Sequence, residues 1–203
     1  MIFTLLILLF SIIIHEIAHG SIAYYLGDPT AKNAGRLDLN PLMHLDPIGS
    51  VLLPLFMSFL GGPIIGWAKP VPINPMYFRD KRWGELKVSL AGPLSNFTIA
   101  LIFGLIVKFI ALPQSFLTIA AIVIFYNIVL GIFNLIPIYP LDGSHILFSL
   151  LPESFNAFKI FMTQYGFIIL LFLIFIIPNS GLNWIFALAT KILALFFNQP
   201  AVF

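Results

Sequence analysis

The chain has 203 residues, of which 60% are hydrophobic and 9% are charged, and its mean hydropathy is +1.05. This composition excludes a soluble domain and a disordered chain, and it predicts an integral membrane protein. The formal net charge of +2 is too small to indicate a nucleic-acid partner. The chain contains no cysteine, so a zinc site would use histidine and carboxylate ligands, as catalytic sites commonly do.

The first predicted element is a membrane helix over residues 3–26, ended by a glycine and a proline. It contains the pattern His-Glu-x-x-His. Because side chains four positions apart share one face of a helix, His15 and His19 can bind one metal ion with Glu16 beside it. Ionisable groups are costly inside a bilayer and usually mark function there. The alternative is a pair of neutral histidines bonded to neighbouring carbonyls, with Glu16 protonated.

A polar loop is expected over residues 30–46. Its His44 and Asp46 are further candidate zinc ligands, although solvated or helix-capping side chains are the more common roles. Residues 47–66 are apolar, but prolines and glycines interrupt them, which is a poor pattern for an uninterrupted span. Alternating prolines within residues 66–75 forbid a helix and predict an extended segment similar to the edge of a sheet.

The rest of the chain alternates between apolar stretches and short breaks. The further spans expected are 85–110, 115–136, 160–177 and a shorter one over 183–197. The fold class is therefore an all-α polytopic membrane protein with five or six transmembrane helices and a re-entrant or extended segment. Without internal repeats or low-complexity linkers, we expect one domain over residues 1–203, with its core over 3–150 and additional spans over 160–197.

The basic residues indicate the orientation in the membrane. Seven of them lie between the end of the first span and the first turn of the 85–110 span: Lys32, Arg36, Lys69, Arg79, Lys81, Arg82 and Lys87. The positive-inside rule then places residues 27–87 in the cytoplasm and the N-terminus outside. In that topology residues 47–66 enter the membrane and return on the same side. The alternative is a true second span, which would place Lys32 and Arg36 opposite the other five.

Two histidines leave a catalytic zinc ion short of its usual third protein ligand. Of the eight acidic residues, only Glu16 and Asp142 lie within or directly after an apolar span. Asp142 follows a span that ends on the same side as the first helix, so it can reach the metal. Asp142 could also cap the helix that follows it, which is compatible with binding a metal. His145 could donate to a ligand or to substrate, but a rim histidine without a role is the simpler interpretation.

The sequence resembles the site-2 proteases, which are intramembrane zinc metalloproteases. The resemblance rests on the His-Glu-x-x-His pattern and on the run Asn-Leu-Ile-Pro-Ile-Tyr-Pro-Leu-Asp-Gly over 134–143, which is similar to the family's Asn-x-x-Pro-x-x-Pro-x-Asp-Gly signature. It also rests on the helix that contains Gly92, Pro93 and Asn96. These markers occur in the family's order.

The resemblance implies a core of three helices and one zinc ion held by His15, His19 and Asp142, with Glu16 as general acid and base. Relatives also carry an extended segment beside the site, and residues 66–75 are similar to it. This chain lacks a PDZ domain and a nucleotide-binding domain. It therefore resembles the minimal bacterial or archaeal branch, in a cell membrane with the active site towards the cytoplasm.

The function predicted is hydrolysis of peptide bonds in membrane-embedded or membrane-proximal proteins. Asn96 and Asn134 are candidate donors to the oxyanion, although hydrogen bonds between helices are an alternative role for each. A substrate helix must unwind before cleavage, and the extended segment offers an edge for strand addition. The competing function is a non-hydrolytic metal-binding or transport membrane protein, but a carrier would spread its polar groups along a path across the membrane.

Overall fold

The protein is helical throughout most of the part that the structure describes. The computed structural model describes residues 2–52, 55–56, 59, 68–175 and 183–197. The long helices are α1 (Ile2–Tyr25), α4 (Gly84–Phe109), α5 (Gln114–Asn134) and α7 (Asn156–Phe175). The shorter elements are α2 (Thr30–Asn33), α6 (Asp142–Leu150), α8 (Asn183–Ala194), η1 (Pro41–Met43), η2 (Pro47–Leu52), η3 (Pro75–Tyr77) and η4 (Glu153–Phe155). No β-strand occurs within these described ranges, which confirms the all-α class.

Four of the described helical elements are long and apolar enough to cross a bilayer: α1, α4, α5 and α7 together with η4. The α8 helix is shorter, with 12 residues, as expected for the last apolar stretch. The polytopic membrane class is therefore confirmed, with four long helices and one short one in the described part against the five or six spans expected. Whether 47–66 spans or re-enters concerns a stretch of which 53–54, 57–58 and 60–66 lie outside the described residues.

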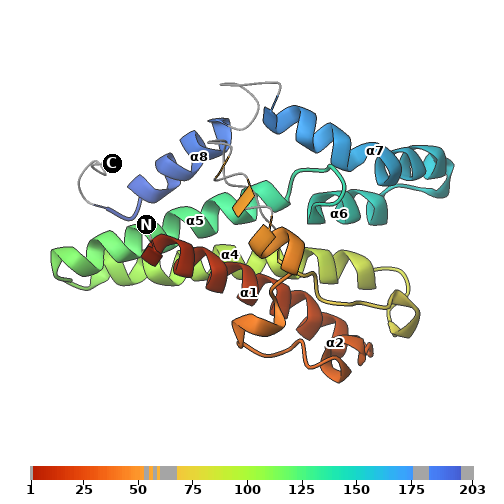
Figure 1. Cartoon of the computed structure of the whole chain (residues 1–203), viewed down its shortest axis with the longest axis horizontal. Helices are drawn as coiled ribbons and strands as arrows, with labels where there is room; N and C mark the ends of the chain where they lie inside the picture. Colours follow the sequence, from red (N-terminus) through yellow and green to blue (C-terminus); the bar gives the residue numbers. More distant parts are fainter. Residues whose placement is uncertain (1, 53–54, 57–58, 60–67, 176–182, 198–203) are drawn as a thin grey trace.

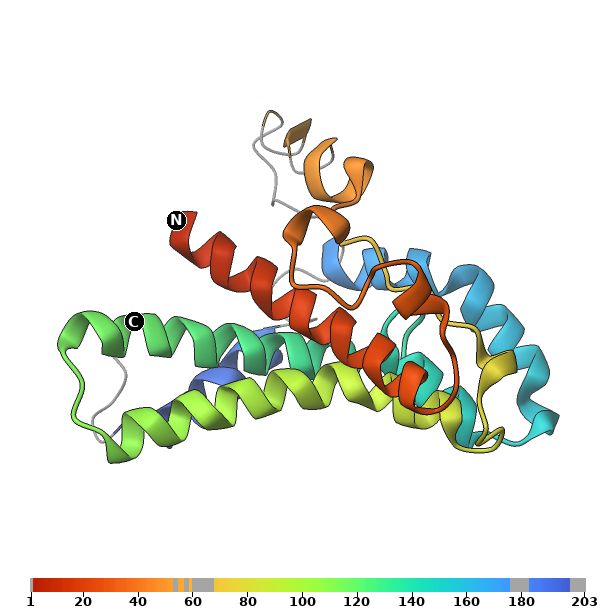
Figure 2. The same cartoon turned by 90° about the horizontal axis from the view of Figure 1, so that it is seen from below.

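Three helices form the centre of the molecule. The α4 and α5 helices run side by side in opposite directions, and α1 packs against both (Figure 1, Figure 2). The α8 helix packs on α5, and α6 packs on α4. The C-terminal end of α1, the N-terminal end of α4 and the end of α5 that leads to α6 lie at the same end of this core (Figure 2). That arrangement brings the distant motifs of the sequence together.

Two apolar clusters lie on either side of a polar layer in the core. The first joins α4, α5 and α8 through Ala100, Ala121, Ile124, Ile128, Ala189 and Leu193. Its alanines allow close approach of the helices, which matters in a membrane because lipid tails remove the hydrophobic drive between helices. The second cluster packs α1 and α4 against the loop between them through Ala23, Leu26, Phe78 and Val88. The partly buried Ile73 packs on this second cluster and so fixes the segment before η3.

Residues 68–74, the described part of the predicted extended segment, have no regular secondary structure. Near the start, the Lys69 N–H donates to the His44 carbonyl at 2.9 Å. The Lys69 carbonyl accepts from the Arg36 guanidinium at 2.6 Å. His44 and Arg36 are both buried, with exposed fractions of 0% and 5%. These contacts give His44 a structural position in the loop.

At its other end the segment is held by Asp28, a fully buried residue three positions after the end of α1. The Asp28 carboxylate accepts from the Asn74 N–H at 2.7 Å, from the Thr30 N–H at 2.9 Å and from the Thr30 hydroxyl. Burial by itself would raise the pKa of this carboxyl group, but the hydrogen bonds from Asn74 and Thr30 outweigh it and lower the pKa below its usual value. Asp28 therefore ties the segment to the same helix that carries both histidines.

We predict that Asp28→Asn lowers the free energy of unfolding by about 1 to 3 kcal/mol, because an amide nitrogen would replace an oxygen that accepts from buried donors. Thermal unfolding in detergent measures this loss. The folded pKa lies below the unfolded value of about 3.9, so the wild type should lose this stabilisation as the pH falls below about 4. The variant should not show that acid-dependent loss, and equal stability of the two proteins at pH 7 would contradict the anchoring role.

Candidate metal centre

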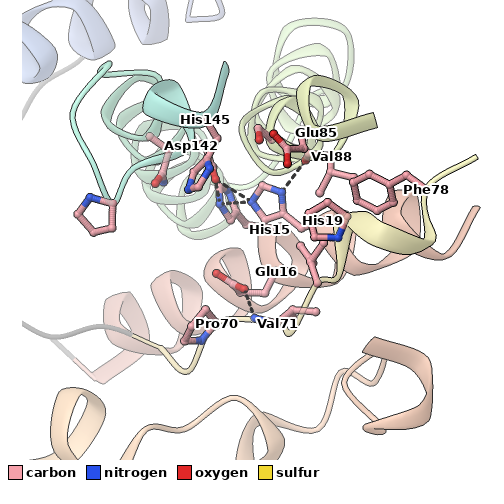
Figure 3. A pocket seen from close by; sticks show the side chains of 15 residues that line it. His15, Glu16, His19, Pro70, Val71, Phe78, Glu85, Val88, Asp142 and His145 are labelled. Atoms are coloured by element: carbon pink, nitrogen blue, oxygen red, sulfur yellow. Dashed lines mark hydrogen bonds and ion pairs between the residues drawn. The ribbon is translucent and has the colours of Figure 1, made fainter. Parts of the chain in front are cut away.

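Three potential metal ligands meet between α1 and the start of α6. The Nε2 atoms of His15 and His19 lie 3.1 Å apart. The Asp142 carboxylate approaches both of them, at 3.1 Å from His15 Nε2 and 3.2 Å from His19 Nε2. Within the described part of the chain, these are the residues that form a cluster of metal-binding type, with their ligand atoms within 4.8 Å of one another (Figure 3). The structure thus brings together the three residues named as ligands from the sequence.

The far nitrogen of each ring is held by an oxygen acceptor on α4. His15 Nδ1 lies 2.7 Å from the Asn96 side-chain oxygen, and His19 Nδ1 lies 2.7 Å from the Val88 carbonyl oxygen. Because an oxygen of this kind only accepts, each Nδ1 carries a proton, and in the neutral ring each Nε2 keeps its lone pair. Outer partners of this sort orient histidine ligands in metal sites.

The donor set fits a zinc ion. Two Nε2 lone pairs and a carboxylate face one another, and Asp142 Oδ2 is buried without a hydrogen bond from any residue in the described ranges. Facing lone pairs and a negative charge repel unless a proton or a metal ion lies between them. Three protein ligands of nitrogen and oxygen type, with room for a fourth position, are typical of catalytic zinc.

Gly92 lets α4 lie directly against the two imidazoles. A Cβ atom at this position would lie 2.4 Å from His19 Nε2 and 2.6 Å from His15 Nε2. The neighbouring Pro93 lies inside the helix and lacks the N–H that would bond to the Ser89 carbonyl. The Gly-Pro pair therefore makes space for the site on α4.

Asp142 reaches the histidines from the first position of α6. The cap position of this helix is Leu141, and the structure shows no capping hydrogen bond from a side chain there. The alternative role of Asp142 as the cap is therefore not the one observed. Gly143 is packed so closely on the preceding loop that a Cβ atom would lie 2.3 Å from the Leu135 carbonyl oxygen. This contact sets the turn that directs the carboxylate towards α1.

Glu16 lies beside the cluster on a cavity of about 370 Å³ (Figure 3). Its Oε2 atom accepts from the Val71 backbone N–H at 2.8 Å, which fixes the carboxylate to the irregular 68–74 segment. The cavity is lined by His15, Glu16, His19, Val71, Asn134 and Asp142, among others. A carboxylate, a metal-binding cluster and an irregular segment therefore share one hollow.

Three other residues that the sequence suggested for the site, Asn134, His145 and Asp46, lie in different places. Asn134 lines the cavity and donates its amide to the Leu130 carbonyl at 3.0 Å. His145 lines the cavity and is exposed, with its ring 5.8 Å from the Tyr139 ring. Asp46 accepts from the backbone N–H groups that begin η2 and does not belong to the cluster.

Asn96 is fully buried, and its amide nitrogen donates to the Asn127 side-chain oxygen at 2.9 Å. Its amide nitrogen is thus already bonded, and the side chain does not line the cavity. In this structure Asn96 holds the His15 ring and is not placed to donate to an oxyanion. The sequence analysis did not find Asn127 or the Val71 N–H. The available signal for Asn127 was an amide inside an apolar span, which is costly there.

Comparisons with known proteins identify the family of this chain. The family model described as "Peptidase family M50" matches residues 110–173, which include Asp142. YwhC of Bacillus subtilis (strain 168), a proposed zinc metalloprotease, is 41% identical over 187 residues, covering 87% of this chain and 82% of that protein. The chain belongs to peptidase family M50. This is the site-2 protease family, and the protein is a membrane zinc metalloprotease.

Other M50 relatives are more distant. Rip2 of Mycolicibacterium smegmatis, also a proposed zinc metalloprotease, is 34% identical over 184 residues, or 89% of this chain and 68% of that protein. Zinc metalloprotease MJ0392 of Methanocaldococcus jannaschii is 32% identical over 91 residues, or 44% of this chain and 27% of that protein. No solved structure matches the chain.

We predict that Gly92→Ala lowers the zinc affinity of the protein by at least about ten-fold, because the new methyl group would displace both imidazoles. Gly104→Ala is the matched control. It makes the same change in the same helix, but its Cβ atom would contact the Phe196 side chain instead of the histidines. Zinc content after titration with a chelator measures the difference, and equal zinc affinity in the two variants would contradict the close fit of α4.

Proposed function

We propose that this M50 protease hydrolyses peptide bonds of membrane-embedded or membrane-proximal proteins at the centre formed by His15, His19 and Asp142. The observation that carries the proposal is the convergence of these three side chains beside Glu16 on one cavity. In the proposal the three residues bind zinc, and Glu16 is the general acid and base.

When bound, zinc supplies a Lewis acid that polarises the scissile carbonyl and lowers the pKa of water. Glu16 removes a proton from the attacking water and returns it to the amine of the leaving segment. The Val71 N–H at 2.8 Å holds the Glu16 carboxylate in the cavity. The far ring nitrogens stay bonded to Asn96 and Val88 throughout, so the two imidazoles keep their orientation.

Asn134 is the proposed donor to the oxyanion of the tetrahedral intermediate. It lines the cavity at the end of α5, eight positions before Asp142. Its amide nitrogen donates to the Leu130 carbonyl in this structure. A small rotation of the side chain would turn one of its two N–H groups to a substrate oxygen, and such donors strengthen catalysis when they meet developing charge.

The active centre lies inside the membrane but near one surface. His19 and His15 precede the end of α1 at Tyr25 by six and ten residues, which at 1.5 Å per residue corresponds to about 9 and about 15 Å. The seven basic residues of the 27–87 region fall between the end of α1 and the first turn of α4, and we propose that this end of the core faces the cytoplasm of a bacterial or archaeal cell. We also propose that residues 1–203 form one domain.

The 68–74 segment is the proposed contact for an unwound substrate. Its backbone has few free donors, because the N–H groups of Lys69, Val71 and Asn74 are engaged and residues 70 and 72 are prolines. In the described residues the Ile73 N–H has no hydrogen-bond partner. A substrate strand would therefore donate mainly to carbonyls of the segment and accept from Ile73.

The catalytic assignment predicts different results for Glu16→Gln and Asp142→Ala. Glu16→Gln should retain zinc and lose about 10²- to 10⁴-fold in cleavage rate, because general acid–base catalysis contributes factors of that size. Asp142→Ala should lose zinc and activity together, since it removes a ligand. Metal analysis of the purified proteins, with cleavage of a panel of single-span substrates, measures both. Full cleavage by Glu16→Gln would overturn the proposal.

The proposed contact with substrate predicts that Ile73→Pro raises KM while zinc content stays normal, because proline removes an N–H that is free to pair with substrate. Val71→Pro is the comparison, and it should lower kcat, since it removes the donor that holds Glu16. Steady-state kinetics on one single-span substrate separates the two effects. An unaltered KM in Ile73→Pro would remove the support for strand addition.

A further inference from the structure

A chain of buried polar side chains joins His15 to two neighbouring core helices. His15 Nδ1 lies 2.7 Å from the Asn96 oxygen, and the Asn96 amide nitrogen donates to the Asn127 oxygen at 2.9 Å. The Asn127 amide nitrogen donates to the Ser11 hydroxyl at 2.9 Å. Ser11, Asn96 and Asn127 are 4%, 0% and 0% exposed, so protein groups must satisfy their polar atoms. We name these residues, with His15, the amide relay.

Backbone carbonyls fix the direction of every bond in the amide relay. The Ser11 hydroxyl donates to the Ile7 carbonyl at 2.8 Å, and the Asn127 nitrogen donates to the Val123 carbonyl at 2.9 Å. A carbonyl only accepts, so the nitrogen and oxygen ends of Asn127 cannot be exchanged without placing oxygen against oxygen. The Asn127 oxygen is then left as an acceptor for Asn96. The oxygen of Asn96 is in turn left as an acceptor for the histidine.

From this order we infer that Asn127 and Ser11 are positioning residues that keep the proton of His15 on Nδ1 and leave its Nε2 free to bind zinc. If the Asn96 amide were reversed, its N–H groups would face His15 Nδ1, and the ring proton would move to Nε2. The reversed oxygen would face the Asn127 oxygen and the Ser11 carbonyl, which now accept from Asn96 at 2.9 and 3.4 Å. In the low dielectric of the core, placing these oxygen atoms against one another without a hydrogen between them is costly.

His19 needs no such relay, because its Nδ1 bonds directly to the Val88 backbone carbonyl at 2.7 Å. A backbone carbonyl can only accept a hydrogen bond, whereas a side-chain amide can be turned so that either its oxygen or its nitrogen faces the ring. The two histidines therefore differ in how their tautomer is held, although both face the same carboxylate. His19 is an internal reference for any change that acts through the amide relay.

Asn127 acts from outside the cavity. It lies on α5 and does not line the hollow, so its influence on zinc passes through Asn96. Amides are expensive in the middle of an apolar span unless their bonds are satisfied, and all the bonds of Asn127 go to the relay or to its own helix. The relay therefore links α1, α4 and α5 at the depth of His15.

The test compares Asn127→Leu and Ser11→Ala with Thr118→Val, all in the full-length chain. Thr118 is exposed on α5 and bonds to the Gln114 carbonyl at 3.1 Å, so its replacement removes a hydroxyl from the same helix without touching the relay. Two quantities are measured: the zinc affinity by competition with a chelator, and the ring-nitrogen NMR shifts of the zinc-free protein with labelled histidine. The inference rests on His15 as a ligand in the proposed function, so His15→Ala is included.

We expect Asn127→Leu to weaken zinc binding by about ten-fold or more, as removal of outer partners does in other metal sites, and Ser11→Ala to weaken it less. In zinc-free Asn127→Leu the His15 signals should show partial protonation of Nε2, whereas those of His19 should not change. Unchanged zinc affinity and His15 signals in Ser11→Ala and Asn127→Leu would overturn the inference. If Asn127→Leu fails to fold, Ser11→Ala decides by the same two measurements. Unchanged zinc binding in His15→Ala would instead overturn the proposed ligand set.

Discussion

The structure depends on one electrostatic requirement, which is to hold two imidazole nitrogens and a carboxylate together where lipid offers no compensating charge. The three groups lie within 4.8 Å of one another. Their mutual repulsion in a medium of low dielectric is far stronger than in water, so a proton or a metal ion is needed between them. Much of the surrounding architecture consists of parts that hold these groups in place. Gly92 brings α4 against the rings, Gly143 shapes the turn before α6, and Val88 and Asn96 bond the far nitrogens.

The membrane explains why the polar side chains between the core helices bond to one another. Inside the core helices, side-chain amides and hydroxyls cannot bond to water, so each finds an oxygen or nitrogen of the protein. Asn96 and Asn127 are satisfied by each other, by Ser11 and by carbonyls. At one end of the core, the Arg36 guanidinium, the His44 backbone carbonyl and the Asp28 carboxylate bond to the irregular segment at 68–74. These polar groups thus lie in two layers, one within the helices and one at their end.

Much of the architecture could be predicted from the sequence, for reasons that differ between elements. The spans were placed to within a few residues because apolar length and helix breakers are local properties, as for α4 at Gly84–Phe109 against the predicted 85–110. His15 and His19 were paired by helical spacing, and Asp142 by its place after a span. The bond from Val71 to Glu16 spans 55 residues and uses a backbone N–H, which no side-chain pattern reveals. The part of Asn96 depended on the direction of its amide, which only its neighbours on other helices determine.

The Asp28 anchor has a mechanical consequence. Asp28 lies three positions after the end of α1, so the segment is attached at Asn74 close to the end of the helix that carries both histidines and Glu16. Helices change their tilt when bilayer thickness changes. Because the 68–74 segment is attached at the end of α1, we expect it to move with the histidines when α1 tilts. The side of the cavity that α1 and the segment form can therefore keep its shape in thin and thick membranes alike.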